Sequence, residues 1–143
     1  MVPRLYHSTA LLLPEARVLA AGAGRGSDGV DYENAEIYSP PYLFGAARPS
    51  ITSAPDAIGY GQTLTVGTSG SPTVTGAILI KCGATTHDNN MSQGVQRWTT
   101  VTRTGSTIAV RVASNRNQLP PGYYMLFMLA GGVPSIARMI RVG

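Results

Sequence analysis

The shortness of the apolar runs constrains the fold of this chain more than any other feature of its sequence. The longest run, residues 123–130, has the length of a strand, whereas a membrane-spanning helix needs roughly 20 apolar residues. Short runs that are rich in β-branched and aromatic side chains and bounded by glycine, proline or polar clusters predict strands. With 17 glycines and 10 prolines among 143 residues, the chain is predicted to be all-β.

The predicted strands fall into two groups of unequal size. The first, in residues 1–45, consists of the runs 8–13, 17–21 and 35–39 and ends at a pair of prolines. Its apolar side chains would be exposed unless they pack on a partner. The second group, in residues 46–143, has the turn-punctuated spacing of a β-sandwich. Its seven predicted strands are 50–52, 62–66, 77–82, 97–102, 107–112, 122–130 and 135–142.

Charge excludes some classes of function. The formal charge is +4, but the ten arginines and the single lysine are scattered without the clustering that nucleic-acid binding would need. No acidic residue follows Asp88, so the tail is purely basic, either as a solvated sheet face or as a face that packs on an acidic neighbour. Cys82 is the only cysteine, which excludes an internal disulfide, and we interpret it as a packing residue.

Three side chains are candidate metal ligands. Tyr6 and His7 stand together before the first strand, and His87, the second of only two histidines, lies in the polar segment 84–90. Copper(II) favours nitrogen and oxygen ligands in a tetragonal arrangement. Neighbouring residues of a regular strand point to opposite faces, so Tyr6 and His7 can share a metal only where the chain is irregular. Taken alone, Tyr6 could equally be an ordinary aromatic and His87 a surface residue.

Several segments together resemble a known family. They are RLYHSTALLLPEARVLAAGAG, AEIYSPPYLF, RPSI, TTHDNN, LPPGYYMLFML and GVPSIA. Nearly end to end, the chain resembles the carboxy-terminal third of the galactose oxidase and glyoxal oxidase family of copper radical oxidases. In that family an immunoglobulin-like domain follows a seven-bladed kelch propeller. The resemblance therefore implies a partial kelch β-propeller blade in residues 1–45 and a seven-stranded immunoglobulin-like β-sandwich, the galactose-oxidase carboxy-terminal domain, in residues 46–143.

The resemblance also implies a copper site and a reaction. Tyr6 would be the axial ligand and the catalytic proton acceptor, His7 an equatorial ligand, and His87 the ligand that the sandwich delivers. A primary alcohol or aldehyde hydrate would be oxidised, and O2 would be reduced to hydrogen peroxide. The cysteine-linked tyrosine that carries the radical belongs to propeller blades that this chain lacks. The implied partner is thus the missing kelch propeller portion, and the chain alone is expected to be inactive.

Other expectations and alternatives accompany this interpretation. The parent is expected to be extracellular or at the cell surface, although this chain shows no signal peptide. The insertion 91–95 departs from the family pattern and could loosen the His87 loop, while Asp88 could orient His87 or be a solvated surface residue. The glycine-rich segment 23–29 is predicted to be a loop. A non-catalytic structural or surface-binding module remains an alternative; a carbohydrate-binding sandwich would need exposed aromatics, and Trp98 is the only tryptophan.

Overall fold

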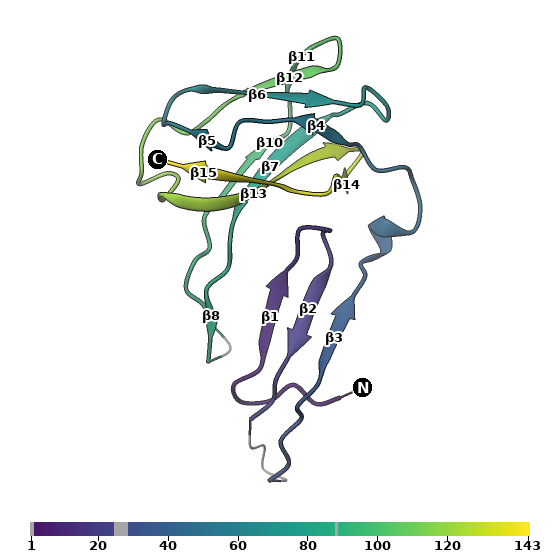
Figure 1. Cartoon of the computed structure of the whole chain (residues 1–143), viewed down its shortest axis with the longest axis vertical. Coiled ribbons are helices and arrows are strands. Elements are labelled where there is room, and N and C mark those ends of the chain that lie inside the picture. Colours follow the sequence, from purple (N-terminus) through teal and green to yellow (C-terminus); the bar gives the residue numbers. More distant parts are fainter. Residues whose placement is uncertain (1, 25–28, 88) are drawn as a thin grey trace.

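The computed structural model describes residues 2–24, 29–87 and 89–143, and its regular secondary structure is almost entirely strand (Figure 1). Residues 25–28 of the predicted glycine-rich loop and Asp88 lie outside the described residues. In the part that is described, the one helical segment is a three-residue 3-10 turn, η1 (Pro41–Leu43), which is far too short to cross a membrane. The all-β class is confirmed.

The amino-terminal sheet consists of β1 (Thr9–Leu12), β2 (Val18–Ala21) and β3 (Ala35–Tyr38), in that order and antiparallel. The predicted runs 8–13, 17–21 and 35–39 match these strands to within a residue at each end. The side chains of β1 and β2 are mostly half-buried, whereas every residue of β3 is exposed. The sheet therefore does not form a closed core of its own.

Two sheets face each other in the rest of the chain. One has the order β10-β7-β13-β15-β5, with β14 paired to β13, and the other has the order β11-β12-β6-β4. The strands of the first sheet are β5 (Ala57–Ile58), β7 (Gly76–Lys81), β10 (Val95–Trp98), β13 (Gly122–Ala130), β14 (Val133–Pro134) and β15 (Arg138–Val142). Those of the second sheet are β4 (Ile51–Ser53), β6 (Thr63–Thr68), β11 (Thr102–Thr104) and β12 (Thr107–Arg111).

The hydrophobic core lies between these two sheets. Alternate residues of β6 and β12 point inward and meet the inward face of β7, β13 and β15, so that Leu64, Leu79 and Leu126 are fully buried. Burying one such side chain contributes roughly 1.5–3 kcal/mol to folding. Strand β13 is central, as its uninterrupted apolar sequence predicts, because its outward residues Met125 and Phe127 are also covered.

The predicted strand 97–102 is wrong. The structure has two strands there, β10 and β11, which belong to different sheets and are separated by a bend at Thr99 and Thr100. Trp98 packs against the core from the end of β10, and its indole nitrogen donates to the carbonyl of Arg111. A side chain of this size anchors the chain where it crosses between the sheets. The short strands β5 and β14 were not predicted either, since two residues show no periodicity.

The amino-terminal sheet packs on the outer face of the sandwich through the tip of its first hairpin. Ala16, which has a φ of 63°, is 3% exposed and packs in one cluster with Met125 and Phe127. The amide of Ala137 donates to the carbonyl of Pro14 over 2.8 Å. These contacts join the two parts at one end of β1 and β2, while a second hairpin, β8 (Thr85–Thr86) and β9 (Asn89–Asn90), lies beside β1 (Figure 1).

Candidate metal centre

Tyr6 and His7 occupy a tight turn immediately before β1. The amide of Ser8 donates to the carbonyl of Leu5 over 3.0 Å and closes the turn, and His7 has a φ of 63°. A positive φ at the third position is required in a type II turn, and histidine is among the few non-glycine residues that adopt it with some frequency. Outside the strand, the two neighbouring rings come together, with centroids 4.0 Å apart and planes at 73°. The chain is thus irregular here, which is the condition under which these two side chains could share a metal.

Two glycines seat this turn against the end of β2. The amide of Gly24 donates to the carbonyl of Tyr6 over 2.5 Å, and a Cβ at residue 24 would lie 3.0 Å from that oxygen and 3.4 Å from Cδ2 of His7. Gly22 has a φ of +73°, and a Cβ there would lie 3.1 Å from the carbonyl oxygen of His7. The sequence interpretation missed this role, although the spacing of two glycines just after β2 was its visible signal.

His87 lies in the turn that joins β8 to β9, within the segment that was predicted to be a polar loop. Its φ is 50°, and the Nδ2 of Asn89 donates to its carbonyl over 2.9 Å. The side-chain oxygen of Asn90 accepts from the amides of Ala84 and Ser92, which closes the base of the hairpin. The segment is therefore a small hydrogen-bonded hairpin, and it presents His87 at its tip.

One nitrogen of the His87 ring already has a partner. The hydroxyl of Thr86 lies 2.8 Å from Nδ1 of His87. A metal-bound histidine usually uses its other ring nitrogen to hydrogen-bond a nearby acceptor, and this second contact fixes the ring orientation. Because Nδ1 is engaged in this way, a metal that binds His87 would have to use Nε2.

The three predicted ligands come together in space. The ring centroids of His7 and His87 are 4.5 Å apart, and those of Tyr6 and His87 are 6.1 Å apart. Tyr6 is 58% exposed, so its phenol is accessible to a small molecule. An open cleft of about 300 Å³ adjoins His7 and includes Asp31 and Glu33 in its lining. The arrangement joins two segments that are far apart in the sequence, one from each part of the chain.

This donor set fits part of a copper(II) site. Two imidazoles and a phenol supply nitrogen and oxygen donors of the kind that copper(II) prefers. Within the described ranges there is no group of three or more histidine, cysteine, aspartate or glutamate side chains that could hold a metal. Further ligands would therefore have to come from outside this group of three side chains.

Two other residues singled out in the sequence lie away from this centre. Cys82 is half-buried in the cluster that joins the hairpin tip to the sandwich, and burial raises the pKa of its thiol. A raised pKa disfavours the thiolate, so the thiol is not activated for metal binding or nucleophilic attack. Trp98 is half-buried against the core. The aromatic platform that a carbohydrate-binding sandwich would need is thus not formed by the only tryptophan.

Comparison with known proteins places the chain in a family. Galactose oxidase of Gibberella zeae is 36% identical over 149 aligned residues, which cover 99% of this chain and 22% of that protein. An aldehyde oxidase of Vitis pseudoreticulata, GLOX, is 32% identical, with 99% of this chain and 30% of that protein covered. Among solved structures, a fungal alcohol oxidase of the AA5 family in complex with copper superposes with a TM-score of 0.85 at 32% identity.

That structural match covers 99% of this chain and 32% of the alcohol oxidase chain. The chain therefore spans between about a fifth and a third of the length of the relatives that it matches. Residues 48–142, which contain both sheets of the sandwich, match the family described as galactose oxidase-like, early set domain. The chain belongs to the galactose oxidase-like early set domain family.

Proposed function

We propose that this chain is the carboxy-terminal part of a copper radical oxidase that oxidises a primary alcohol or an aldehyde with O2 and yields hydrogen peroxide. The single observation that carries the proposal is the meeting of Tyr6, His7 and His87, with the two imidazole centroids 4.5 Å apart. The three residues come from a turn before β1 and from the β8–β9 hairpin. Two imidazoles and a phenol that meet at an exposed position offer nitrogen and oxygen donors to a metal ion, which supports this proposal.

In this proposal the three side chains have different roles. Nε2 of His87 and one nitrogen of His7 bind copper, and the hydroxyl of Thr86 holds the His87 ring through Nδ1. The phenol oxygen of Tyr6 would bind the metal and would accept the proton of the substrate hydroxyl. Copper, together with a cysteine-linked tyrosine outside this chain, would supply the one-electron chemistry that couples oxidation of the alcohol to reduction of O2.

The remaining machinery is proposed to lie outside this chain. The cysteine-linked tyrosine and most of the substrate pocket would belong to a kelch propeller, of which residues 1–45 are a partial blade and on which residues 46–143 form a following domain. The half-exposed apolar side chains of β3, Ile37 and Tyr38, are consistent with such a neighbour. We expect the longer protein to be extracellular or at the cell surface, and this chain alone to lack oxidase activity.

Copper(II) titration of the chain tests the ligand assignment. Calorimetry and electron paramagnetic resonance should show one tetragonal site with nitrogen hyperfine coupling, and His87→Ala should remove part of that coupling. Tyr6→Phe should keep the nitrogen coupling and weaken binding. Weak binding that is the same in the unsubstituted chain and in both variants would reject the assignment. The sandwich would then be a structural or surface-binding module, which is the alternative.

Turnover tests the reaction in the longer protein. A primary alcohol should give the aldehyde and hydrogen peroxide in equal amounts, with one O2 consumed for each. His7→Ala in the same protein should abolish the reaction. Oxidation of the alcohol without peroxide would exclude this reaction type.

A further inference from the structure

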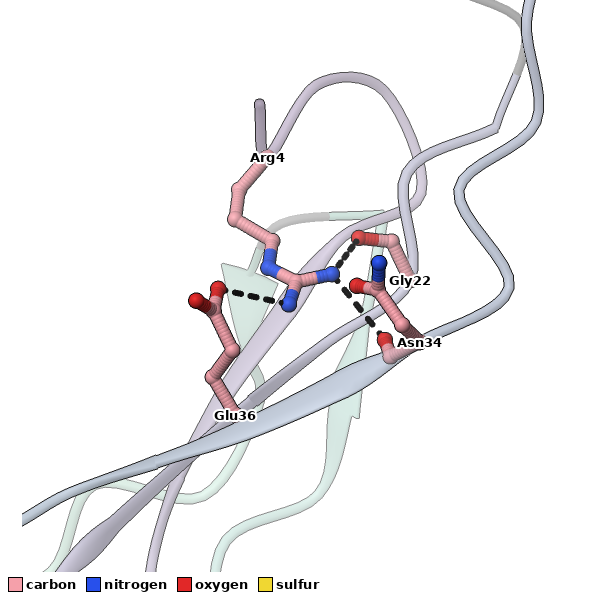
Figure 2. A network of polar contacts seen from close by, with 4 residues as sticks. All are labelled: Arg4, Gly22, Asn34 and Glu36. Carbon is pink, nitrogen blue, oxygen red and sulfur yellow. Dashed lines mark hydrogen bonds and ion pairs between the residues drawn. The ribbon is translucent and has the colours of Figure 1, made fainter. Parts of the chain in front are cut away.

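The guanidinium of Arg4 joins three segments of the amino-terminal sheet (Figure 2). Its Nη1 donates to the carbonyls of Gly22 and Asn34, each over 3.0 Å. Its Nη2 donates to Oε2 of Glu36 over 2.8 Å. One side chain thus bridges the residue after β2, the residue before β3 and β3 itself.

These contacts lie at the end of the sheet that carries Tyr6 and His7. Ala21 and Ala35 form the last register pair between β2 and β3, and Arg4 spans the two chain segments just beyond that pair. Gly22, whose carbonyl Arg4 holds, is also the residue that packs against the carbonyl of His7. Arg4 is two residues before Tyr6. Its hydrogen bonds therefore connect the start of the Tyr6–His7 turn to the segment on which that turn packs.

Arginine is suited to this position for reasons of charge and shape. The Arg4 side chain is 17% exposed and Glu36 is 52% exposed, so the ion pair alone would contribute little. The hydrogen bonds to the two carbonyls are charge-assisted, and the bond to Gly22 is also partly shielded from water, which strengthens it. A planar guanidinium reaches three acceptors on two segments at once, whereas a lysine ammonium is a single point on a flexible stem.

We propose that Arg4 is a positioning residue that fixes the Tyr6–His7 turn against Gly22 and Gly24. The mechanistic significance of this role rests on the proposed function, but the positioning itself does not depend on copper. Without Arg4, the segment before Tyr6 loses its hydrogen bonds to the ends of β2 and β3. The amide of Gly24 should then lose its protected bond to the carbonyl of Tyr6.

Hydrogen exchange on the full chain without metal is the first test. Arg4→Met should speed exchange of the Gly24 amide by about 10- to 100-fold, the range expected when charge-assisted hydrogen bonds are lost. The Met128 amide, which donates to Oγ of Ser135 inside the sandwich, should not change and reports that the sandwich is folded. Arg138→Met removes a different arginine, which forms an ion pair with Asp56 over 3.0 Å, and should leave Gly24 unaffected.

Two conservative variants separate positioning from general destabilisation. Glu36→Gln keeps a side-chain oxygen that accepts from Nη2, so the exchange of Gly24 should stay within about threefold of the unsubstituted chain. Arg4→Lys keeps the charge but cannot reach all three acceptors, so it should speed Gly24 exchange even if Arg4→Met does not fold. With copper(II) bound, Arg4→Met should alter the nitrogen hyperfine pattern, and Glu36→Gln should preserve it.

The outcomes are distinguishable. An unchanged Gly24 amide in both Arg4 variants, or a Gly24 amide that is unprotected in the unsubstituted chain, would overturn the proposal. If the Gly24 amide responds as expected while the unsubstituted chain binds no copper, the positioning role stands and the proposed function fails.

Discussion

The imidazole rings of His7 and His87 lie with their centroids 4.5 Å apart, although the two residues belong to separate turns, and both have a positive φ, 63° and 50°. Among the described residues, Ala16 is the only other non-glycine residue with this backbone conformation. Sparsely populated conformations tend to gather at sites where the surrounding structure determines them. The distance between the rings therefore depends on two turns and on how the β8–β9 hairpin packs against β1.

Gly83 lies where the chain that leads into this hairpin comes close to β1. A Cβ on Gly83 would lie 2.7 Å from Cδ1 of Leu11 on β1. Gly83→Val should push the hairpin away from β1, remove the contacts between the His7 and His87 rings in nuclear Overhauser spectra, and lower copper(II) affinity by about tenfold or more. Gly45→Val is the matched control, because nothing lies within 4 Å of a Cβ there. Equal effects of the two substitutions would contradict the packing argument.

The backbone of His7 makes a separate prediction. Asparagine tolerates a positive φ, whereas a β-branched residue does not, so His7→Val should destabilise the amino-terminal sheet by about 1 kcal/mol more than His7→Asn. Hydrogen exchange of the Ser8 amide, which closes the turn, measures this difference. Both variants should lose one imidazole from the copper signal. If the imidazole coupling in the copper(II) spectrum is unchanged in His7→Asn, His7 is not a ligand.

The hydroxyl of Thr86 should determine the orientation of the His87 ring. Thr86→Val replaces the hydroxyl by a methyl group of similar size and removes the 2.8 Å contact to Nδ1. Ring nitrogen shifts in the metal-free chain should then show a changed tautomer balance for His87, and Thr86→Ser should restore it. An unchanged His87 spectrum in Thr86→Val would mean that Nδ1 is not held by this hydroxyl.

Most of the longer strands could be predicted because they depend on local patterns. Alternation along residues 107–112 and the apolar sequence of residues 122–130 reflect how far each strand is buried, and the structure confirms both strands. The crossing between sheets at Thr99 could not be predicted, since the direction of the chain after Trp98 depends on where the indole packs. Local periodicity does not encode that contact.

In the candidate site, too, some features are visible in the sequence and others depend on contacts between distant segments. That Tyr6 and His7 stand together is visible in the sequence, and the family resemblance drew attention to His87. Two glycines after the second strand are visible in the sequence, but the roles of Arg4, Gly22 and Gly24 depend on contacts between residues 15 to 32 positions apart, which local patterns do not encode. The hydroxyl of Thr86 is adjacent to His87 in sequence, yet only the turn geometry shows that it reaches Nδ1.

Tyr124 should make the stability of the sandwich fall at alkaline pH. Burial, with a smaller contribution from Tyr60, raises the pKa of Tyr124. The folded state therefore favours the neutral phenol. The resulting contribution to the free energy of unfolding is fully present below the ordinary tyrosine pKa of about 10, and it is lost as the pH rises through the higher pKa of the folded state. Urea unfolding across that pH range should show a smaller decrease in the free energy of unfolding for Tyr124→Phe than for the unsubstituted chain. Tyr123→Phe, at an exposed neighbour, is the control, and equal flattening in both would contradict the assignment.

Arg48 should determine whether the two parts of the chain stay docked. Its Nη2 donates to the carbonyls of Glu15 and Ser135 over 2.9 and 2.8 Å, and its Nε donates to the carbonyl of Pro134 over 2.8 Å. It thus binds the hairpin tip and the sandwich with one guanidinium. Arg48→Met should leave these partly buried carbonyls without their donor, which costs about 2 kcal/mol in docking.

The loss should be local, because the core between the two sheets does not include Arg48. The amide of Ala137, which donates to Pro14, should exchange about 10- to 100-fold faster, while the Met128 amide keeps its rate. Arg103→Met, at an exposed position on β11, should change neither. Since β1 must stay docked for His7 to face His87, Arg48→Met should also broaden the electron paramagnetic resonance spectrum of bound copper(II). An unchanged spectrum with a freely exchanging Ala137 amide would show that the β8–β9 hairpin alone holds β1 in place.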